Sequence, residues 1–141
     1  MLLQSRAAAL AYVTPRVFQG TDQQRANALR LVEQFGDRSS IESLDLALGD
    51  ASSLVRTAAV FALARLGDQK EYAEILRTSR NEWEEEAVPS ALVMVAPRAV
   101  PYLEMVVAGS DPATLSDERA RADAARALCF MGEAGLAAWG S

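Results

Sequence analysis

The chain has 141 residues, of which half are apolar, 6% are aromatic and none is histidine, and its formal net charge at pH 7 is −5. A chain of this length can close one hydrophobic core without a disulfide or a metal, and the lone Cys129 cannot form an internal disulfide. The negative charge disfavours a polyanionic partner, and the sequence has no run of 18 apolar residues that could cross a membrane.

The N-terminal segment, residues 1–13, is predicted to be a helix rather than a signal peptide. Gln4, Ser5 and Arg6 stand where a signal peptide requires its apolar stretch. Since nothing indicates an oxidising compartment, we expect a cytoplasmic protein. An amphipathic organellar transit segment stays open, because Asp22 is the first acidic residue. The apolar stripe of the predicted helix consists of Leu3, Ala7, Leu10 and Val13.

Four segments farther along the chain share one length and one kind of ending. They begin at Arg25, Arg56, Glu86 and Arg121, and each reaches a glycine or proline 11 residues later, at Gly36, Gly67, Pro97 and Gly132. These end points are 31, 30 and 35 residues apart. In each segment the fourth, eighth and eleventh positions lie on one stripe of a helix: Ala28, Val32 and Phe35; Ala59, Leu63 and Leu66; Pro89, Val93 and Ala96; Ala124, Leu128 and Met131. Such recurrence predicts a structure built from copies of one helical unit.

A shorter apolar pattern precedes each later segment, so the unit is predicted to be a pair of antiparallel helices. The shorter patterns are Ile41, Leu44 and Leu48; Tyr72, Ile75 and Leu76; and Val100, Leu103 and Val107. We therefore expect an all-α fold without a sheet: a single-domain α-solenoid (superhelix) of about four repeats, at residues 1–36, 37–67, 68–97 and 98–133. Residues 134–141 would form a terminal cap or a truncated helix.

Capping residues and glycines mark the expected helix boundaries. Capping-box spacing is found for Thr21 with Gln24, Ser39 with Glu42, and Ser79 with Glu82, and Ser116 followed by Asp117 and Glu118 favours a further start. Helices are expected to end at Gly36, Gly67 and Gly132, each in the left-handed conformation. Pro89 lies inside its segment and is expected to bend or shorten that helix.

The stretch from residue 50 to residue 68 resembles a HEAT repeat, in particular the short HEAT-like form found in phycobilisome lyase subunits. The matching residues are Asp50, Val55, Arg56, Ala59, Leu63, Leu66, Gly67 and Asp68. Residues 99–103, AVPYL, resemble the start of that family's first helix. The resemblance implies a ladder of salt bridges between units, formed by the Asp before each second helix and the Arg inside it. Asp50 and Arg56 match this spacing, Arg25 and Arg121 supply only the arginine, and Glu86 reverses the charge, so a complete ladder is not expected.

The resemblance also implies that the second helices line the concave face of the solenoid, where a partner would bind. The positions pointing away from the core stripe are the third, sixth and tenth of each segment: Asn27, Arg30 and Gln34; Ala58, Phe61 and Arg65; Val88, Ala91 and Val95; Asp123, Arg126 and Phe130. Aromatic and arginine side chains are common interface anchors, so we expect a protein or peptide to bind Arg30, Phe61, Arg65, Arg126 and Phe130. The alternative that neighbouring segments bury at least one of the two rings stays open.

Catalysis is not expected from this composition. Without histidine the chain lacks the commonest general base and the commonest zinc ligand, and its glycines and carboxylates form no phosphate loop or metal-loop spacing. Cys129 follows Leu128 in an apolar helix and is expected to be a buried, unreactive thiol. The leading hypothesis is therefore a non-catalytic protein-interaction or scaffold module that needs no cofactor and no metal.

Two other functions are considered beside this one. The subfamily resemblance implies a bilin lyase-like or chaperone-like role in attaching a linear tetrapyrrole. Some HEAT-like glycosylases bind nucleic acid through arginines, but the acidic balance and the single lysine of this chain argue against a nucleic-acid partner. An apolar, unshielded terminal repeat would favour a homodimer.

Overall fold

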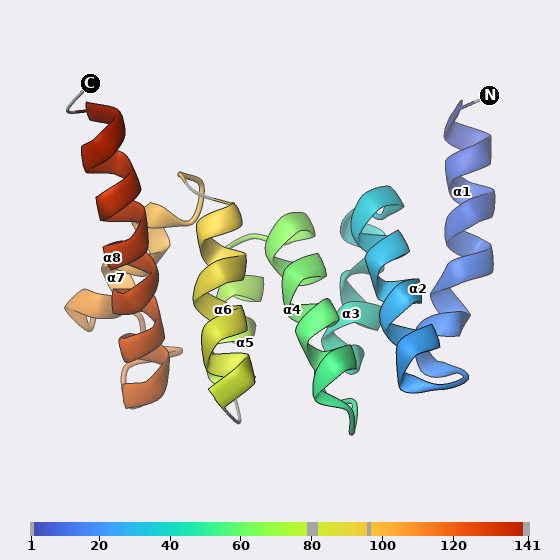
Figure 1. Cartoon of the computed structure of the whole chain (residues 1–141), viewed down its shortest axis with the longest axis horizontal. Helices are drawn as coiled ribbons and strands as arrows, with labels where there is room; N and C mark the ends of the chain where they lie inside the picture. The colour runs from blue at the N-terminus through green and yellow to red at the C-terminus, as the bar shows by residue number, and fades with distance from the viewer. Residues whose placement is uncertain (1, 79–81, 96, 140–141) are drawn as a thin grey trace. The chain divides into compact units, whose positions relative to one another are not determined.

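The computed structural model describes the backbone of residues 2–78, 82–95 and 97–139 and the side chains of residues 5–77, 87–95 and 97–132. Helices make up the regular structure of these residues, with no β-strand among them, so the predicted all-α class is confirmed (Figure 1). None of the helices in the described part of the chain combines the length and the hydrophobicity that crossing a membrane requires.

The chain divides into two compact units at the boundary between the second and third predicted repeats. Unit 1 comprises Met1–Gly67 and unit 2 comprises Asp68–Ser141. The charge divides unevenly between them. Residues 1–67 carry seven basic and six acidic side chains, a net charge of +1, whereas residues 68–141 carry seven basic and 13 acidic ones, a net charge of −6. The acidic character of the protein therefore belongs to unit 2 alone.

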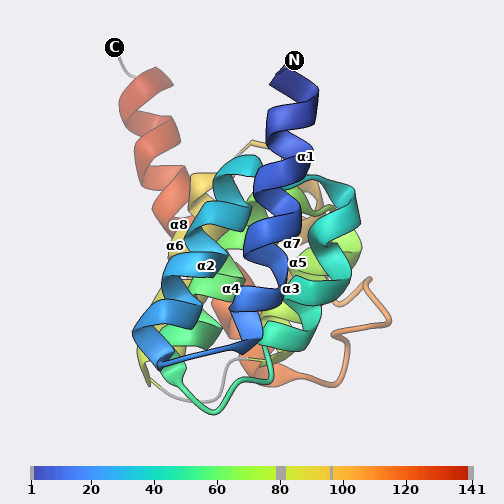
Figure 2. The ribbon, with the colours of Figure 1, turned by 90° about the vertical axis from the view of Figure 1, so that its right-hand side faces the viewer.

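Unit 1 consists of two neighbouring helix pairs, which occupy the predicted repeats 1–36 and 37–67. Its elements are α1 (Leu2–Val13), η1 (Thr14–Phe18), α2 (Asp22–Phe35), η2 (Arg38–Ser40), α3 (Ile41–Ala47) and α4 (Ser53–Leu66), where η denotes a 3-10 helix. Helices α2 and α4 pack side by side, α1 and η1 pack on α2, and α3 packs on α4. Figure 2 shows α1 with α2 on one side and α3 on the other.

The core of unit 1 follows the predicted stripes except at the helix ends. Ala28, Val32, Ala59 and Leu63 are buried as expected. Further buried side chains fill the space between the helices, among them Val17, Leu29, Leu44 and Val55, each fully buried. Burying one such leucine contributes about 1.5 to 3 kcal/mol. Phe35, predicted to be core, is 40% exposed, because it lies in the last turn of α2, where the chain leaves the helix.

The predicted cap of α2 is confirmed, whereas that of α3 is wrong. Thr21 Oγ1 accepts a hydrogen bond from Gln24 N at 3.2 Å, and Gln24 Oε1 accepts one from Thr21 N at 2.8 Å. Ser39 does not cap α3 with Glu42. Instead, Asp37 caps η2 by accepting from Ser39 N at 2.9 Å, since the short 3-10 turn begins two residues earlier than the predicted helix.

The glycines at 36 and 67 end their helices, but not in the left-handed conformation that the sequence predicts. Gly36 has φ −75° and Gly67 has φ −101°, both accessible to any residue. The requirement at Gly36 is space. A Cβ built there would lie 2.9 Å from both Leu66 Cδ1 and Ser40 Oγ and would clash with the carbonyl oxygen of Val32. Close packing between the two repeats, rather than a positive φ, explains this glycine.

One salt bridge joins the second helix of the first repeat to the loop before the second helix of the next. Arg25 donates two hydrogen bonds to Asp50, from Nε to Oδ2 at 2.9 Å and from Nη2 to Oδ1 at 3.0 Å. This pairing holds the pKa of the Asp50 carboxyl below its usual range and raises the pKa of Arg25. Arg56 Nη1 also donates to the backbone oxygens of Asp50 and Ala51, and its positive charge further lowers the pKa of the Asp50 carboxyl.

Unit 2 is also built from helices. Its elements are α5 (Gln69–Thr78), α6 (Glu82–Met94), α7 (Val100–Ala108) and α8 (Glu118–Trp139). Helix α6 packs on α8, and so do α5 and α7. Asp117 Oδ1 accepts from Ala120 N at 3.0 Å at the start of α8, where the sequence predicts a helix start. The predicted cap at Ser79 lies outside the described residues.

Two expectations about unit 2 are wrong, those for Gly132 and Cys129. Helix α8 continues through Gly132 to Trp139, so Gly132 ends no helix and residues 134–139 extend α8. Helix α6 runs for 13 residues and contains the buried Pro89 in its interior. Cys129 is exposed, because it faces away from the helices that pack on α8. A left-handed glycine does occur in this unit, at Gly109 after α7, with φ 76°.

Candidate functional site

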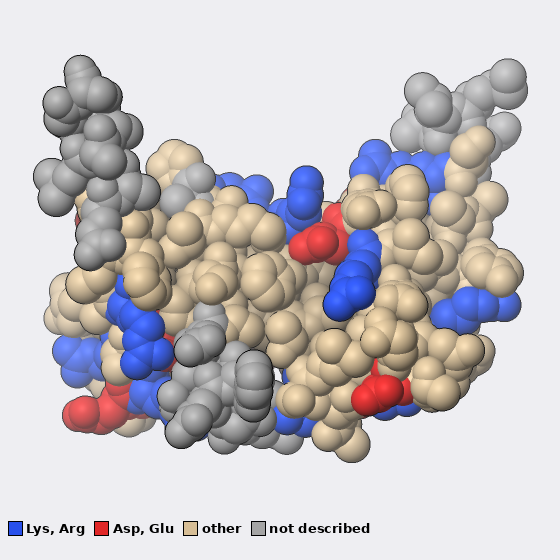
Figure 3. All heavy atoms as spheres, viewed as in Figure 1, with Lys and Arg blue, Asp and Glu red and all other residues tan. Residues whose placement is uncertain are grey.

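Three of the predicted partner-binding residues lie in unit 1. Arg30 on α2 is exposed, and its Nη1 donates to Asn27 Oδ1 at 3.4 Å. Phe61 on α4 is partly buried, and Arg65 one turn later is exposed. Asn27 and Gln34 are exposed as well, so the outward face of α2 agrees with the prediction. Figure 3, which shows the side carrying α2 and α4, has charged side chains scattered among uncharged ones.

The other two predicted residues lie on α8 of unit 2. Phe130 leaves 52% of its surface exposed, and the side chain of Arg126 is 46% exposed. The four-residue spacing puts both on one face of the helix. Arg126 Nη1 lies 3.7 Å from Asp123 Oδ1, and the Asp123 side chain is almost fully buried. The aromatic ring and the guanidinium are therefore accessible to a partner on the same side of α8.

Other positions predicted to face outward are buried. Ala58, Val88, Ala91 and Asp123 expose between 0% and 9% of their surface. Each lies on a helix that contacts more than one neighbour: α4 contacts α2 and α3, α6 contacts α5 and α8, and α8 contacts α5, α6 and α7. A helix flanked on two sides has a wider buried arc than a single apolar stripe provides. The outward face predicted from one stripe is therefore too wide.

A buried polar cluster in unit 2 was not predicted. Tyr102 Oη donates to Asp111 Oδ2 at 2.6 Å, and Thr114 Oγ1 donates to the same oxygen at 2.8 Å. Burial and the hydrogen bond to Asp111 raise the pKa of Tyr102. Burial alone would raise the pKa of Asp111, but the hydrogen bonds from Tyr102 and Thr114 outweigh it, so this pKa is lowered. The cluster ties the loop after α7 to that helix and has a structural role.

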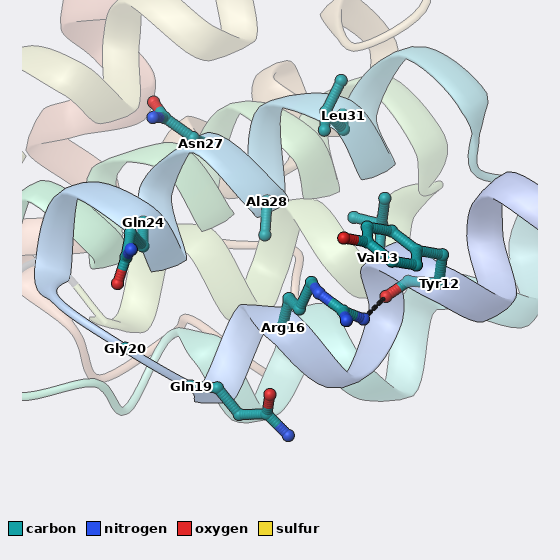
Figure 4. A pocket seen from close by; sticks show the side chains of 9 residues that line it. All are labelled: Tyr12, Val13, Arg16, Gln19, Gly20, Gln24, Asn27, Ala28 and Leu31. Atoms are coloured by element: carbon teal, nitrogen blue, oxygen red, sulfur yellow. Dashed lines mark hydrogen bonds between the residues drawn. The ribbon is translucent and has the colours of Figure 1, made fainter.

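A pocket between α1, η1 and α2 was also not predicted. Its volume is about 450 Å³. It is lined by Tyr12, Val13, Arg16, Gln19, Gly20, Gln24, Asn27, Ala28 and Leu31 (Figure 4). The α2 residues follow the spacing of one helical stripe, which the sequence contains. The opposite wall comes from Tyr12 and Arg16, and their proximity to that stripe depends on how η1 turns the chain.

Among the described side chains, no group of three or more histidine, cysteine, aspartate or glutamate residues is arranged to hold a metal ion. Comparison with models of protein families, with curated proteins and with solved structures found no match for the chain. Its function must therefore be argued from its own residues.

Proposed function

We propose that the chain is a HEAT-like α-solenoid module that binds a protein partner through the outward faces of its second helices. Support for the repeat comes from unit 1, where α2 and α4 lie side by side and the Arg25–Asp50 pair links successive repeats. Unit 2 repeats the pairing of a short helix with a longer one. No catalytic role is part of this proposal.

The observation that carries the binding role is the exposure of Phe130 beside Arg126. Phe130 has 52% of its surface exposed and lies one turn from Arg126, whose side chain is 46% exposed, so a partner can contact both at once. Phe61 and Arg65 repeat the same four-residue arrangement on α4, with the ring more buried. Aromatic rings next to arginines are the side chains that most often dominate binding energy at interfaces. Arg30 adds a third guanidinium, on α2.

The test compares variants of these residues with exposed apolar controls on first helices. Two double variants should each abolish affinity capture of the native partner. They are Phe61→Ala with Arg65→Ala, and Arg126→Ala with Phe130→Ala. The controls, Leu46→Ala on α3 and Met105→Ala on α7, remove exposed apolar side chains and should leave capture intact. Helicity by circular dichroism should be equal in all of them.

Other outcomes would reject the proposal. If both site variants capture the same partner as well as the controls do, the second-helix faces are not the binding surface. Capture that disappears after nuclease treatment would favour nucleic acid, and an absorbance change on titration with a bilin would favour the tetrapyrrole role.

A further inference from the structure

The pocket in unit 1 combines apolar, aromatic and polar side chains. Val13, Ala28 and Leu31 supply an apolar lining, and Leu31 is 41% exposed. Tyr12, 63% exposed, adds an aromatic surface at the end of α1. Its volume lies in the range of about 300 to 1,000 Å³ that is typical of ligand-binding pockets. A ligand with a large hydrophobic group would bury this exposed apolar surface.

Arg16 is held in the pocket wall by two contacts. Its guanidinium carbon lies 3.6 Å from the centroid of the Tyr12 ring, and Nη1 donates to the backbone oxygen of Tyr12 (Figure 4). In Figure 4 the side chain of Ala28 points from α2 toward this arginine. Within the described part of the chain, Nε and Nη2 of Arg16 make no hydrogen bond. A guanidinium already fixed on an aromatic ring loses less side-chain entropy when it binds an anion.

The two amides on the α2 side offer donors rather than acceptors. Gln24 Oε1 accepts from Thr21 N, and Asn27 Oδ1 accepts from Gln23 Nε2 at 3.0 Å and from Arg30 Nη1. Their acceptor oxygens are thus engaged, and within the described residues their amide nitrogens are not. No acidic side chain lines the pocket, and unit 1 lacks the net negative charge of unit 2. The polar part of the pocket is therefore complementary to a carboxylate.

We propose that this pocket binds a short peptide segment of a partner protein that presents a carboxylate next to a large hydrophobic side chain. The carboxylate accepts from Arg16, and the hydrophobic side chain packs on Val13, Ala28 and Leu31. The inference rests on the proposed protein-binding function, because it takes the partner to be a protein. It adds a second contact site, formed by α1, η1 and the side of α2 that carries Asn27, apart from the Phe61–Arg65 and Phe130–Arg126 pairs.

The experiment uses the full chain, labelled with nitrogen-15, and three capped peptides: acetyl-Leu-Glu-Leu-amide, acetyl-Leu-Gln-Leu-amide and acetyl-Ala-Glu-Ala-amide. The first should shift backbone amide resonances of residues 12–31 in two-dimensional NMR titrations. The second, without the charge, and the third, without the hydrophobic groups, should each bind at least about tenfold more weakly. Equal affinity for all three peptides, or no shift in residues 12–31, would overturn the proposal.

Arginine variants distinguish binding in the pocket from nonspecific electrostatic attraction of the peptide to the protein. Arg16→Gln should weaken binding of the first peptide by about tenfold or more, whereas Arg16→Lys should retain part of it and Arg38→Gln, which removes an exposed arginine of η2, should have no effect. Amide spectra of the free variants report whether each is folded. If Arg38→Gln weakened binding of the first peptide as much as Arg16→Gln does, the assignment of Arg16 as the carboxylate-binding residue would be contradicted.

Two further outcomes distinguish the source of the carboxylate and the two proposals. If free 4-methylpentanoate binds as tightly as the first peptide, the pocket takes small carboxylic acids and the peptide assignment is wrong. If no peptide binds but partner capture still depends on Phe61 and Phe130, the pocket proposal fails and the proposed function stands. If peptides bind the pocket but capture of the partner is unchanged in the Phe61/Arg65 and Arg126/Phe130 variants, the proposed function fails.

Discussion

Replacing Gly36 and Gly132 by alanine should change stability in opposite directions, although the sequence gives both glycines the same place in the repeat. At Gly36 the new Cβ meets Leu66, Ser40 and the Val32 carbonyl oxygen, two of them side chains of the next repeat. Since φ is −75°, alanine brings no backbone strain, and the whole cost is steric. Overpacking of this kind destabilises by about 1 to 3 kcal/mol.

At Gly132 the same substitution meets nothing within 4 Å and lies inside α8. Alanine in a helix interior is more stable than glycine by about 0.8 to 1 kcal/mol, so Gly132→Ala should stabilise the protein by that amount. Gly109→Ala is a useful third variant. Its φ of 76° is left-handed, and alanine there should destabilise by about 1 to 2 kcal/mol without a steric clash.

Urea unfolding followed by circular dichroism at 222 nm measures all three changes, with the slope m unchanged. In thermal unfolding, 1 kcal/mol corresponds to a shift in Tm of roughly 3 °C for a chain of this length. If Gly132→Ala destabilised as much as Gly36→Ala, the description of α8 as a continuous helix with open space at Gly132 would be refuted.

Two electrostatic predictions complete the set. The pKa of Asp50 is lowered in the folded state by Arg25, so the stability it contributes is present above the usual aspartate pKa of 3.8 and is lost as pH falls through the lower folded value. Asp50→Asn should therefore reduce stability at pH 7 and flatten the acid side of the stability curve measured by urea unfolding. Tyr102→Phe removes a hydrogen bond to buried Asp111 and should lower the free energy of unfolding by about 1 to 3 kcal/mol in the same assay. Spectrophotometric titration of the wild-type protein should show one tyrosine ionising above the usual pKa of 10.

Helix positions in this protein could be predicted because they depend on local spacing. Apolar residues three and four apart identify α3, α5 and α7 from patterns as short as Ile41, Leu44 and Leu48. The Thr21–Gln24 cap is likewise a contact between residues three apart. Such features are determined within one or two turns of chain, so a single sequence contains them.

The features that could not be predicted depend on residues distant in the sequence. Arg25 pairs with Asp50, 25 residues away, whereas the sequence pattern gave Arg25 no acidic partner of its own. The crowding at Gly36 comes partly from Leu66, 30 residues later. In the same way, the pocket exists only because η1 brings Arg16 and Tyr12 to the stripe of α2. Spacing along one helix cannot report which neighbour covers it.

The candidate binding residues were predicted with mixed success for the same reason. A stripe opposite the core identifies Arg30, Arg65, Arg126 and Phe130 as exposed, while Phe61 is partly covered. The same stripe fails on α6, where Val88 and Ala91 are buried. Whether the five residues bind one partner stays a prediction.

The distance between the two units tests the α-solenoid proposal most directly. Cys129 on α8 is exposed and can carry a spin label, and Gln34→Cys on α2 provides a second exposed position. If the repeats of both units stack in one register, double electron–electron resonance should give a single narrow distance distribution, unchanged by moderate salt. A broad distribution, or one that changes with salt, would show that the two units do not form one continuous solenoid.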